Sequence, residues 1–378
     1  MSVEIKEITD KKGLKQFITF QWELYKGVPQ FVPPMMDFEM STFNQEKNPA
    51  FNTSTGRFWM AYKNNKPVGR IIGIINKEEA KGSQFIRFGW VDFIDDEEVS
   101  KALIQTVEDW GKENGLNKIH GPLGFTDLDF EGTLVGGFNQ ISTQATMYNF
   151  PYYKDHFEKL GFEKAVDWTE ARIQVPLWKG EGYIDEINRK ADIIGMRYGL
   201  KIKEFKSGKE ILKYGDKVFE LLNDTYSHLY GYHKLTEEQI KYFIDQYFGF
   251  VQKDFIALVV NENDEVIAFA ITFPSLSKAF QKAKGKMFPF GFAHVLKSFF
   301  FNDTVDFFLV AVKEEYQRKG ANALLWKRLL WAFKKHKIKY LCSGQMLEDN
   351  SNVNNLWSRY EPSADEEIRR RCFTKAIS

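Results

Sequence analysis

The second half of the chain alternates apolar runs with amphipathic stretches, and the alternation predicts strands and helices in turn. Two apolar runs on either side of the polar turn 262–264 predict a β-hairpin. One face of a later stretch carries Leu324, Leu325, Leu329 and Leu330, which is typical of an amphipathic helix. The predicted elements are, in order, the strands 255–261, 265–273 and 305–312, the helix 321–336, the strand 338–342, a short helix 350–360 and the strand 368–376.

The first half repeats this order of elements with almost no sequence identity to the second. Its predicted elements are the strands 58–63, 68–76 and 85–94, a helix ending at Gly115 and a strand 118–120. Asp95 and Glu98 form a predicted capping box for that helix. Strands that alternate with helices favour an α/β fold around a mixed sheet.

Pro176, Gly180 and Gly182 interrupt the pattern, so we place a domain boundary near 176–184. The predicted domains are 1–180 and 181–378, and 181–199 is a predicted connecting helix.

Composition narrows the class of protein. The 378 residues include 43% hydrophobic and 27% charged residues, which is typical of a soluble globular protein of about two domains. The net charge of +1 gives no general argument for binding nucleic acid or anionic membranes. Cys342 and Cys372 are the two cysteines, which fits a reducing cytoplasm. The alternating N-terminus predicts a strand rather than a signal peptide, and no apolar run is long enough to predict a transmembrane helix.

The segment 305–331 is the clearest candidate for chemistry. An apolar strand leads through a polar loop with Gly320 into an amphipathic helix. A helix start offers unpaired backbone N–H groups and the positive end of the helix dipole, so it is suited to a phosphate or pyrophosphate. Arg318 and Lys319 add positive charge to this loop.

This stretch resembles the acyl-coenzyme-A-binding segment of the GNAT superfamily of N-acyltransferases. The family pattern is Gln/Arg-x-x-Gly-x-Gly/Ala, and Gln317, Gly320 and Asn322 occupy its three fixed positions. Asn322 departs from the usual Gly or Ala. Either its side chain crowds the pyrophosphate, or the loop is shifted by one residue and Ala323 takes the small position. The resemblance implies that acetyl-CoA or another acyl-CoA is held by Gln317, Arg318, Lys319, Gly320, Ala321, Asn322 and Ala323.

Two segments of the first half are also similar to the family. Tyr152–Phe162 resembles its Tyr-x-x-x-Gly-Phe end segment, and Lys66–Ile71 resembles its hairpin. The resemblance therefore covers nearly the whole chain. It implies two tandem GNAT-like domains, each a mixed, mostly antiparallel sheet flanked by helices.

The two halves differ at the coenzyme loop. The first-half strand ends in Asp95-Asp96-Glu97-Glu98, with no Gly and no basic residue, so it would repel an anion. We therefore predict that only the second half binds an acyl-CoA. The alternative is that both halves have lost activity.

The family resemblance also implies roles in catalysis. Backbone N–H groups around Val310 to Val312 would polarise the thioester carbonyl. Asn350 matches the Asn that begins the family's next helix and is also a plausible N-cap. Trp357 occupies the position where the family has the Tyr that acts as general acid. Tyr360, one helical turn later, is therefore the candidate that protonates the thiolate. Glu348 is a candidate base that would act through water. The scattered His and Cys residues lack metal-site spacing, and we predict no metal.

Two insertions have open interpretations. Asp129 and Glu131 in the aperiodic loop 124–138 could hold a cationic acceptor, or they could lie on a solvated turn. The Phe-rich segment 282–301 could form a channel for a long acyl chain, an interfacial membrane patch, or packing between the two halves, which we favour. Arg369-Arg370-Arg371 is basic, but we interpret it as a solvated strand edge and predict no nucleic-acid partner.

The sequence thus favours a cytoplasmic acyl-CoA-dependent N-acyltransferase acting on a small-molecule or peptide amine. The alternatives are a non-catalytic ligand-binding or interaction protein, which Asn322 and Trp357 would explain, and a lipid-directed acyltransferase that uses the Phe-rich segment.

Overall fold

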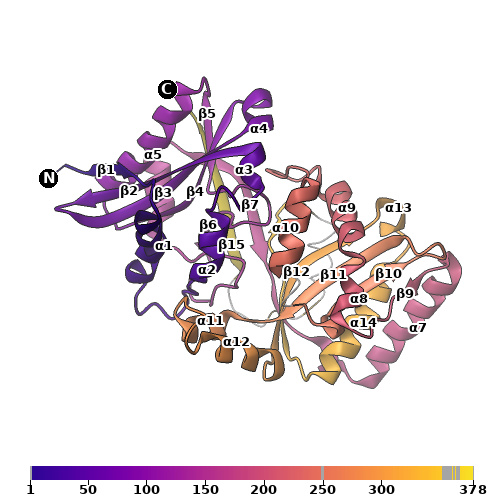
Figure 1. The fold of residues 1–378 in the computed structure, drawn as a ribbon. Coiled ribbons are helices and arrows are strands. Elements are labelled where there is room, and N and C mark those ends of the chain that lie inside the picture. The colour runs from indigo at the N-terminus through magenta and orange to yellow at the C-terminus, as the bar shows by residue number, and fades with distance from the viewer. Residues whose placement is uncertain (1, 248–250, 351–359, 361, 363–366, 378) are drawn as a thin grey trace. The chain divides into compact units, whose positions relative to one another are not determined.

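The computed structural model describes residues 2–247, 251–350, 360, 362 and 367–377. They form two compact units, each built around its own sheet (Figure 1). Unit 1 comprises Met1–Thr169, Ser277–Val295 and Glu366–Ser378, and unit 2 comprises Glu170–Leu276 and Leu296–Asp365. Each unit therefore collects segments that are distant in sequence. Whether 1–180 and 181–378 are independent domains stays a prediction.

The sheet of unit 1 runs in the order β1 (Glu4–Glu7), β2 (Ser54–Lys63), β3 (Lys66–Asn76), β4 (Phe85–Phe93), β5 (Lys118–Gly121), β15 (Ile368–Ala376) and β7 (Glu163–Glu170), and β6 (Thr133–Gly136) pairs with β15. β4 and β5 are parallel, while β1 to β4 pair antiparallel in sequence order. The amphipathic helix α5 (Glu97–Glu113) packs its apolar face on one side of this sheet, against Ile71 and Phe88. α1 (Lys11–Leu24) packs on the other side, against Ile72 and Ile74.

The sheet of unit 2 runs in the order β8 (Arg172–Gln174), β13 (Tyr340–Cys342), β12 (Thr304–Val312), β11 (Val266–Pro274), β10 (Ile256–Val260) and β9 (Lys201–Ile202). β12 and β13 are parallel and the other pairs are antiparallel. α14 (Asn322–Lys335) contributes its leucines to the core and packs against α7 (Glu181–Tyr198), beside it in Figure 1. α9 (Gly215–Tyr226) contacts β11 and β12.

The remaining described elements are α2 (Met36–Thr42), α3 (Ala50–Thr53), α4 (Lys77–Gly82), α6 (Tyr152–Lys159), α8 (Gly208–Leu212), α10 (Glu237–Tyr247), α11 (Ser277–Ala283), α12 (Gly291–Phe300), α13 (Glu314–Gln317), β14 (Met346–Leu347) and two 3₁₀ turns, Pro176–Lys179 and Lys253–Phe255. The predicted strands and long helices are confirmed within a few residues at their ends. The predicted helix 350–360 falls mostly on residues outside the described part.

The cap of α5 differs from the prediction. Asp96, not Asp95, is the N-cap, and its side chain accepts the N–H of Glu98. Asp95 instead bonds His156 Nε2 at 2.9 Å. Two adjacent acids at a helix start are equivalent by pattern, and the neighbouring His156 selects which of them caps the helix.

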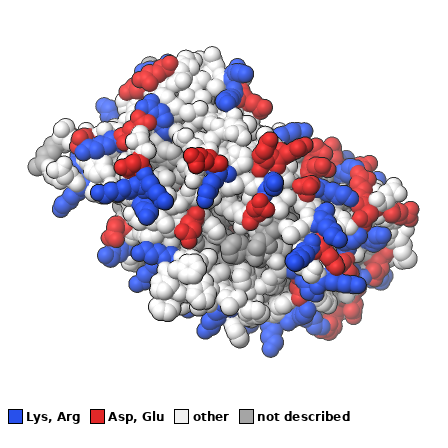
Figure 2. Space-filling model, in the orientation of Figure 1, with Lys and Arg blue, Asp and Glu red and all other residues white. Residues whose placement is uncertain are grey.

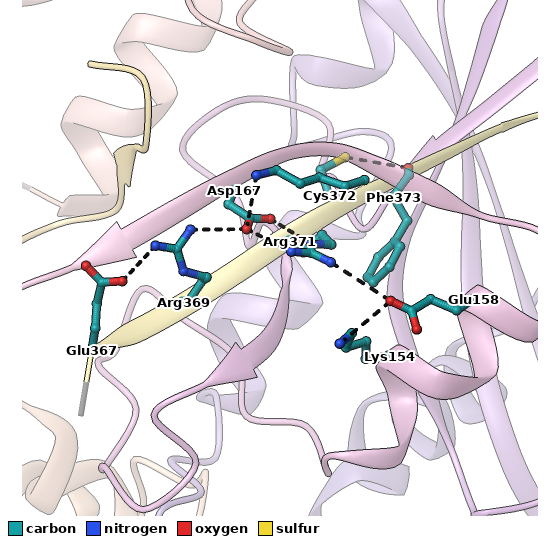
Figure 3. A network of polar contacts seen from close by, with 9 residues as sticks. Lys154, Glu158, Asp167, Glu367, Arg369, Arg371, Cys372 and Phe373 are labelled. Atoms are coloured by element: carbon teal, nitrogen blue, oxygen red, sulfur yellow. Dashed lines mark hydrogen bonds and ion pairs between the residues drawn. The ribbon is translucent and has the colours of Figure 1, made fainter. Parts of the chain in front are cut away.

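The last strand also differs from the order inferred for the second half. β15 lies inside the sheet of unit 1, between β5 and β7. Figure 3 shows how its arginines are held: Arg369 and Arg371 ion-pair with the buried Asp167. Arg370 is buried and donates to the carbonyl of Met147. The interpretation of this triplet as a solvated edge is therefore wrong, because β15 has strand neighbours on both sides and Asp167 supplies the counter-charge.

Candidate functional site

Strand β12 of unit 2 is paired along one side and only at its beginning on the other. It pairs with β11 from Val305 to Val312, whereas its parallel pairing with β13 ends at Asp306. A register shift leaves Phe308 as the extra residue between the pairs formed by Phe307 and Leu309, which is a β-bulge. Within the described residues, no strand pairs with the rest of that edge.

The backbone groups of Val310 and Val312 point to this unpaired edge. Lys313 N–H donates to β11, and the direction of backbone groups alternates along a strand. The contacts agree, because the Tyr226 hydroxyl donates to the Val310 carbonyl at 2.9 Å and Gln317 Nε2 donates to the Val312 carbonyl at 3.1 Å. In the described part of the chain, no acceptor is found for the N–H of Val310 or of Val312. The edge therefore offers two backbone donors.

The loop after β12 ends in a second set of backbone donors. No acceptor is found among the described residues for the N–H groups of Gly320, Ala321 and Asn322, at the start of α14. Gly320 has φ +83°, which favours glycine, and a Cβ there would lie 2.8 Å from Ile194 of α7. The positive φ is the reason that glycine is favoured at this turn, since the end of the Ile194 side chain could move aside.

The other predicted loop residues surround these donors. Gln317 is exposed, and its side-chain amide ties the loop to the end of β12. Arg318 is exposed, and the Lys319 ammonium lies over the ring of Tyr316 at 4.5 Å. Ala321 is buried, whereas Asn322 and Ala323 are half-buried in the first turn of α14. The structure thus brings the predicted loop residues together beside the open edge of β12.

The three remaining predicted residues follow β13. Tyr360 is half-buried, with its ring 5.5 Å from that of Trp326 on α14. Glu348 lies in the turn after β14, and the Asn350 N–H donates to the Leu347 carbonyl. Trp357 is outside the described residues, and the roles of Tyr360, Glu348 and Asn350 stay predictions.

Asp306 is a candidate that the sequence analysis missed. It is 5% exposed, and its carboxylate faces the side chains of Ser275 and Cys342 and the positive charge of Arg172. Burial raises the pKa of this carboxyl to about 6, partly offset by Ser275 and by the positive charge of Arg172. Cys342 pairs with Asp306 in register, and burial raises the pKa of that thiol above its usual range, so it is a core residue as expected. The signal was present in the sequence, since Asp306 is the one charged residue of the apolar run 305–312.

Tyr226 was also missed, and no sequence pattern marks it. It reaches β12 only because α9 packs on that strand.

The matching strand end in unit 1 is occupied by the unit's own side chains. The Phe93 N–H, at the end of β4, donates to the Tyr153 hydroxyl at 3.0 Å, and the Phe93 carbonyl accepts from Tyr152 at 2.5 Å. Tyr153 is held by Tyr25 at 2.8 Å and by Asp92 at 3.3 Å. Burial raises the pKa of Tyr153 well above its usual value, so its hydroxyl stays protonated at neutral pH. Tyr153 thus takes up a backbone N–H, the group that the corresponding strand of unit 2 leaves available.

The four acids after β4 are each paired. Asp96 and Glu98 both bind Lys63, while Glu97 binds Lys159. Asp95 bonds His156, as described above. Because their charges are partly compensated, the tyrosine contacts are a stronger obstacle to a ligand than the anionic repulsion expected from the sequence.

The insertion 124–138 is more buried than a solvated turn. Glu131 is 6% exposed, and the Asp129 carboxylate accepts the backbone N–H of Thr126 at 2.9 Å. Burial raises the pKa of Asp129 to about 6. The solvated-turn interpretation is therefore wrong for Glu131, while Asp129 organises its own loop. Their binding of a cationic acceptor stays a prediction.

No group of three or more His, Cys, Asp or Glu side chains among the described residues could hold a metal ion. No described helix combines the length and apolar composition needed to cross a bilayer.

No protein-family model matches the chain. Over 385 residues it is 28% identical to Protein YghO of Escherichia coli (strain K12), and the match covers 99% of this chain and 95% of YghO. Over 290 residues it is 24% identical to the bacterial ceramide synthase of Caulobacter vibrioides (strain NA1000 / CB15N), covering 75% of this chain and 73% of that protein.

A solved structure matches over the whole length. It is the tandem GNAT protein from the clavulanic acid biosynthesis pathway, with a TM-score of 0.56, 11% sequence identity, and coverage of 100% of this chain and 99% of that one. At this identity the likeness concerns the fold, and it agrees with the two mixed sheets flanked by helices. The predicted fold class is confirmed: the chain has the tandem GNAT fold, an α/β arrangement of two GNAT-like domains.

Proposed function

We propose that this protein is an acyl-CoA-dependent N-acyltransferase whose donor binds unit 2. The observation that carries the proposal is that two sets of unpaired backbone N–H groups follow one another in the sequence, on β12 and at the start of α14. Val310 and Val312 present N–H groups at the open edge of β12, and Gly320, Ala321 and Asn322 present theirs at the start of α14. The first set suits a thioester carbonyl and the second a pyrophosphate.

The reaction that fits this arrangement is direct transfer. The acceptor amine attacks the thioester carbonyl, the C–S bond breaks as the amide C–N bond forms, and coenzyme A leaves as a thiolate that takes up a proton. A backbone N–H of β12 would stabilise the negative charge that develops on the carbonyl oxygen.

Proton transfer needs an acceptor for the amine proton. Asp306 has a pKa of about 6 and is ionised at neutral pH, but four residues of extended strand separate it from Val310 by roughly 13 Å, so it would take the proton only through a chain of water molecules. We therefore propose Asp306 as a base that acts through water, and Glu348, in the partly exposed turn after β14, remains the other candidate. Tyr360 remains the candidate that protonates the thiolate.

A lipid acceptor is the second candidate, and one comparison favours it. The relative from Caulobacter vibrioides is named a bacterial ceramide synthase, and ceramide is the N-acylated form of a long-chain lipid amine. The same donor site and the same amide-forming step would serve both a soluble amine and a lipid amine, so the two candidates differ in acceptor and acyl length.

Calorimetric titration with coenzyme A, acetyl-CoA and palmitoyl-CoA tests the proposal. We expect one site per chain with micromolar affinity, and the acyl preference separates small-molecule from lipid chemistry. Absence of binding to all three would overturn the donor site and favour a non-catalytic protein that has kept the fold.

A further inference from the structure

The segment from α11 through α12 exposes an unusual number of large apolar side chains. Phe288 and Phe290, in the turn before α12, are each 74% exposed. The other exposed apolar residues of the segment are Phe292, Leu296, Phe300 and Phe301. These side chains are therefore not part of the core of either unit, and packing between the two halves stays a prediction.

These residues form one surface rather than scattered exposures. Phe292, Leu296 and Phe300 are four residues apart on α12 and therefore share one face of the helix. The opposite side of α12 is anchored, because Val295 is buried and a Cβ at Gly291 would meet the Lys286 carbonyl at 2.0 Å. Before the helix, the Phe288 ring contacts that of Phe292, with centroids 6.0 Å apart. The turn and the helix thus present their rings together.

The charge of the same segment is strongly one-sided. Residues 277–302 include no Asp or Glu and five exposed lysines, Lys278, Lys282, Lys284, Lys286 and Lys297. None of the five forms an ion pair within the described residues, whereas many lysines elsewhere do. Figure 2 shows uncharged surface over α11 and α12 with basic side chains at its border. In a chain of net charge +1, this concentration of unpaired positive charge is local.

We propose that this segment, residues 278–301, is a docking surface for an anionic lipid bilayer. Exposed Phe and Leu side chains enter the boundary between headgroups and acyl chains, and neighbouring lysines are attracted to anionic headgroups. A membrane is favoured over a second copy of the chain, because two copies would bring ten uncompensated lysines together. The inference does not depend on the donor site.

Flotation of the full chain with vesicles tests this surface. One set of vesicles contains only phosphatidylcholine, and the other contains phosphatidylcholine and phosphatidylglycerol in equal parts. We expect binding to the anionic vesicles at low salt, weakened by added salt. Two variants separate the contributions: Phe288→Ser/Phe290→Ser/Phe300→Ser, and Lys282→Glu/Lys284→Glu/Lys286→Glu. Each should lower the partition coefficient at least about tenfold.

Matched controls keep the result specific. Lys11→Glu/Lys12→Glu/Lys15→Glu changes net charge equally on exposed residues of α1, and Met196→Ser/Leu212→Ser removes exposed apolar side chains from unit 2. Both control variants should float like the parent chain. All these positions are exposed or partly exposed, so the fold should persist, which circular dichroism checks.

Three outcomes would overturn the proposal: no binding to anionic vesicles, equal binding by the Phe variant, or a dimer that the Phe variant dissociates without any vesicle binding. Calorimetric titration of the same variants with coenzyme A measures donor binding separately, so the docking surface and the proposed function can fail independently. Vesicle binding without coenzyme binding would refute the enzyme and leave the docking surface standing.

Discussion

The two units treat the same structural position in opposite ways. In unit 1 the N–H and carbonyl of Phe93, at the end of β4, are both bonded by tyrosine hydroxyls. In unit 2 the carbonyls of Val310 and Val312 are bonded by side chains, and their N–H groups are not. A strand end is a candidate binding site when its backbone N–H groups remain available to a ligand. It has only a structural role when side chains of the same chain accept hydrogen bonds from those groups.

The same contrast extends to the helix that follows each strand. α5 begins with an Asp cap and two glutamates, which stabilise its positive end. α14 begins with Ala321 and Asn322, without a side-chain cap or an acid in its first turn. A helix start without a side-chain cap leaves its N–H groups available to an anionic ligand. Four predictions test this comparison, from the largest expected effect to the smallest.

Replacing Asp306 with Asn should reduce kcat by about 10²–10⁴-fold if the carboxylate is the base, because general-base catalysis contributes that much. Affinity for coenzyme A should not change, since the substitution leaves the loop intact. On the proposed function, the parent protein should lose activity as pH falls through about 6, where Asp306 becomes protonated, and this inflection should be absent from the variant. A pH–rate profile of both proteins measures this.

Asp303→Asn is the control for this substitution, since Asp303 is partly exposed directly before β12. The buried Asp306 should also carry a stability signature. Its folded pKa lies above its unfolded value, so the protein loses stability as pH rises from about 4 to 6, and Asp306→Asn should gain about 1–3 kcal/mol at pH 7. Lost activity together with lost stability would instead indicate a structural role.

Asn322→Asp should weaken coenzyme A binding by about 10–100-fold, because a carboxylate would face the pyrophosphate across the first turn of α14. The same substitution should leave stability unchanged or raise it by about 0.3–1 kcal/mol, since an acid suits a helix start. Calorimetry and urea unfolding give the two numbers. Glu97→Gln, at the start of α5, should not change the affinity for coenzyme A. An equal loss of affinity in this variant would contradict the prediction that only unit 2 binds the coenzyme.

Tyr153→Phe in unit 1 should cost about 1–3 kcal/mol of unfolding free energy, because the buried Phe93 N–H loses its acceptor. The number of coenzyme sites should remain one per chain. Chemical denaturation and titration of the same sample check both points, with Tyr183→Phe on the partly exposed side of α7 as the control. A second coenzyme site in the variant would show that Tyr153 had been blocking a competent unit.

Arg318→Ala should have the smallest effect, about a two- to fivefold loss of coenzyme affinity, because an exposed charge acts through screened attraction. The loss should shrink as salt is added. An effect that salt does not change would mean that Arg318 shapes the loop rather than attracting the phosphates.

Local patterns predicted much of the fold. Apolar periodicity located α5, α14 and the strands of both hairpins, because each element must bury one face. The loop from Gln317 to Ala323 could be identified in the same way, since a Gly-containing turn between a strand and a helix is a local feature. Asp306 was identifiable too, as a charge in an apolar strand.

Other features depended on contacts between distant segments. β15 is a strand by its own pattern, but its place in unit 1 depends on Asp167, about two hundred residues earlier, which pairs with Arg369 and Arg371. Tyr226 reaches Val310 only through the packing of α9 on β12. The amphipathic pattern of the Phe-rich segment is compatible with both a buried and an exposed apolar face. Only the fold decided that its phenylalanines remain exposed.

The sequence by itself determined the elements of this protein and the loop suited to a pyrophosphate, because helix periodicity, turn residues and local charge are encoded over short stretches. Only the tertiary structure decided which strand end is closed and which is open. That choice depends on whether Tyr152 and Tyr153, some sixty residues after Phe93, fold back onto its backbone, and no short-range pattern encodes such a contact.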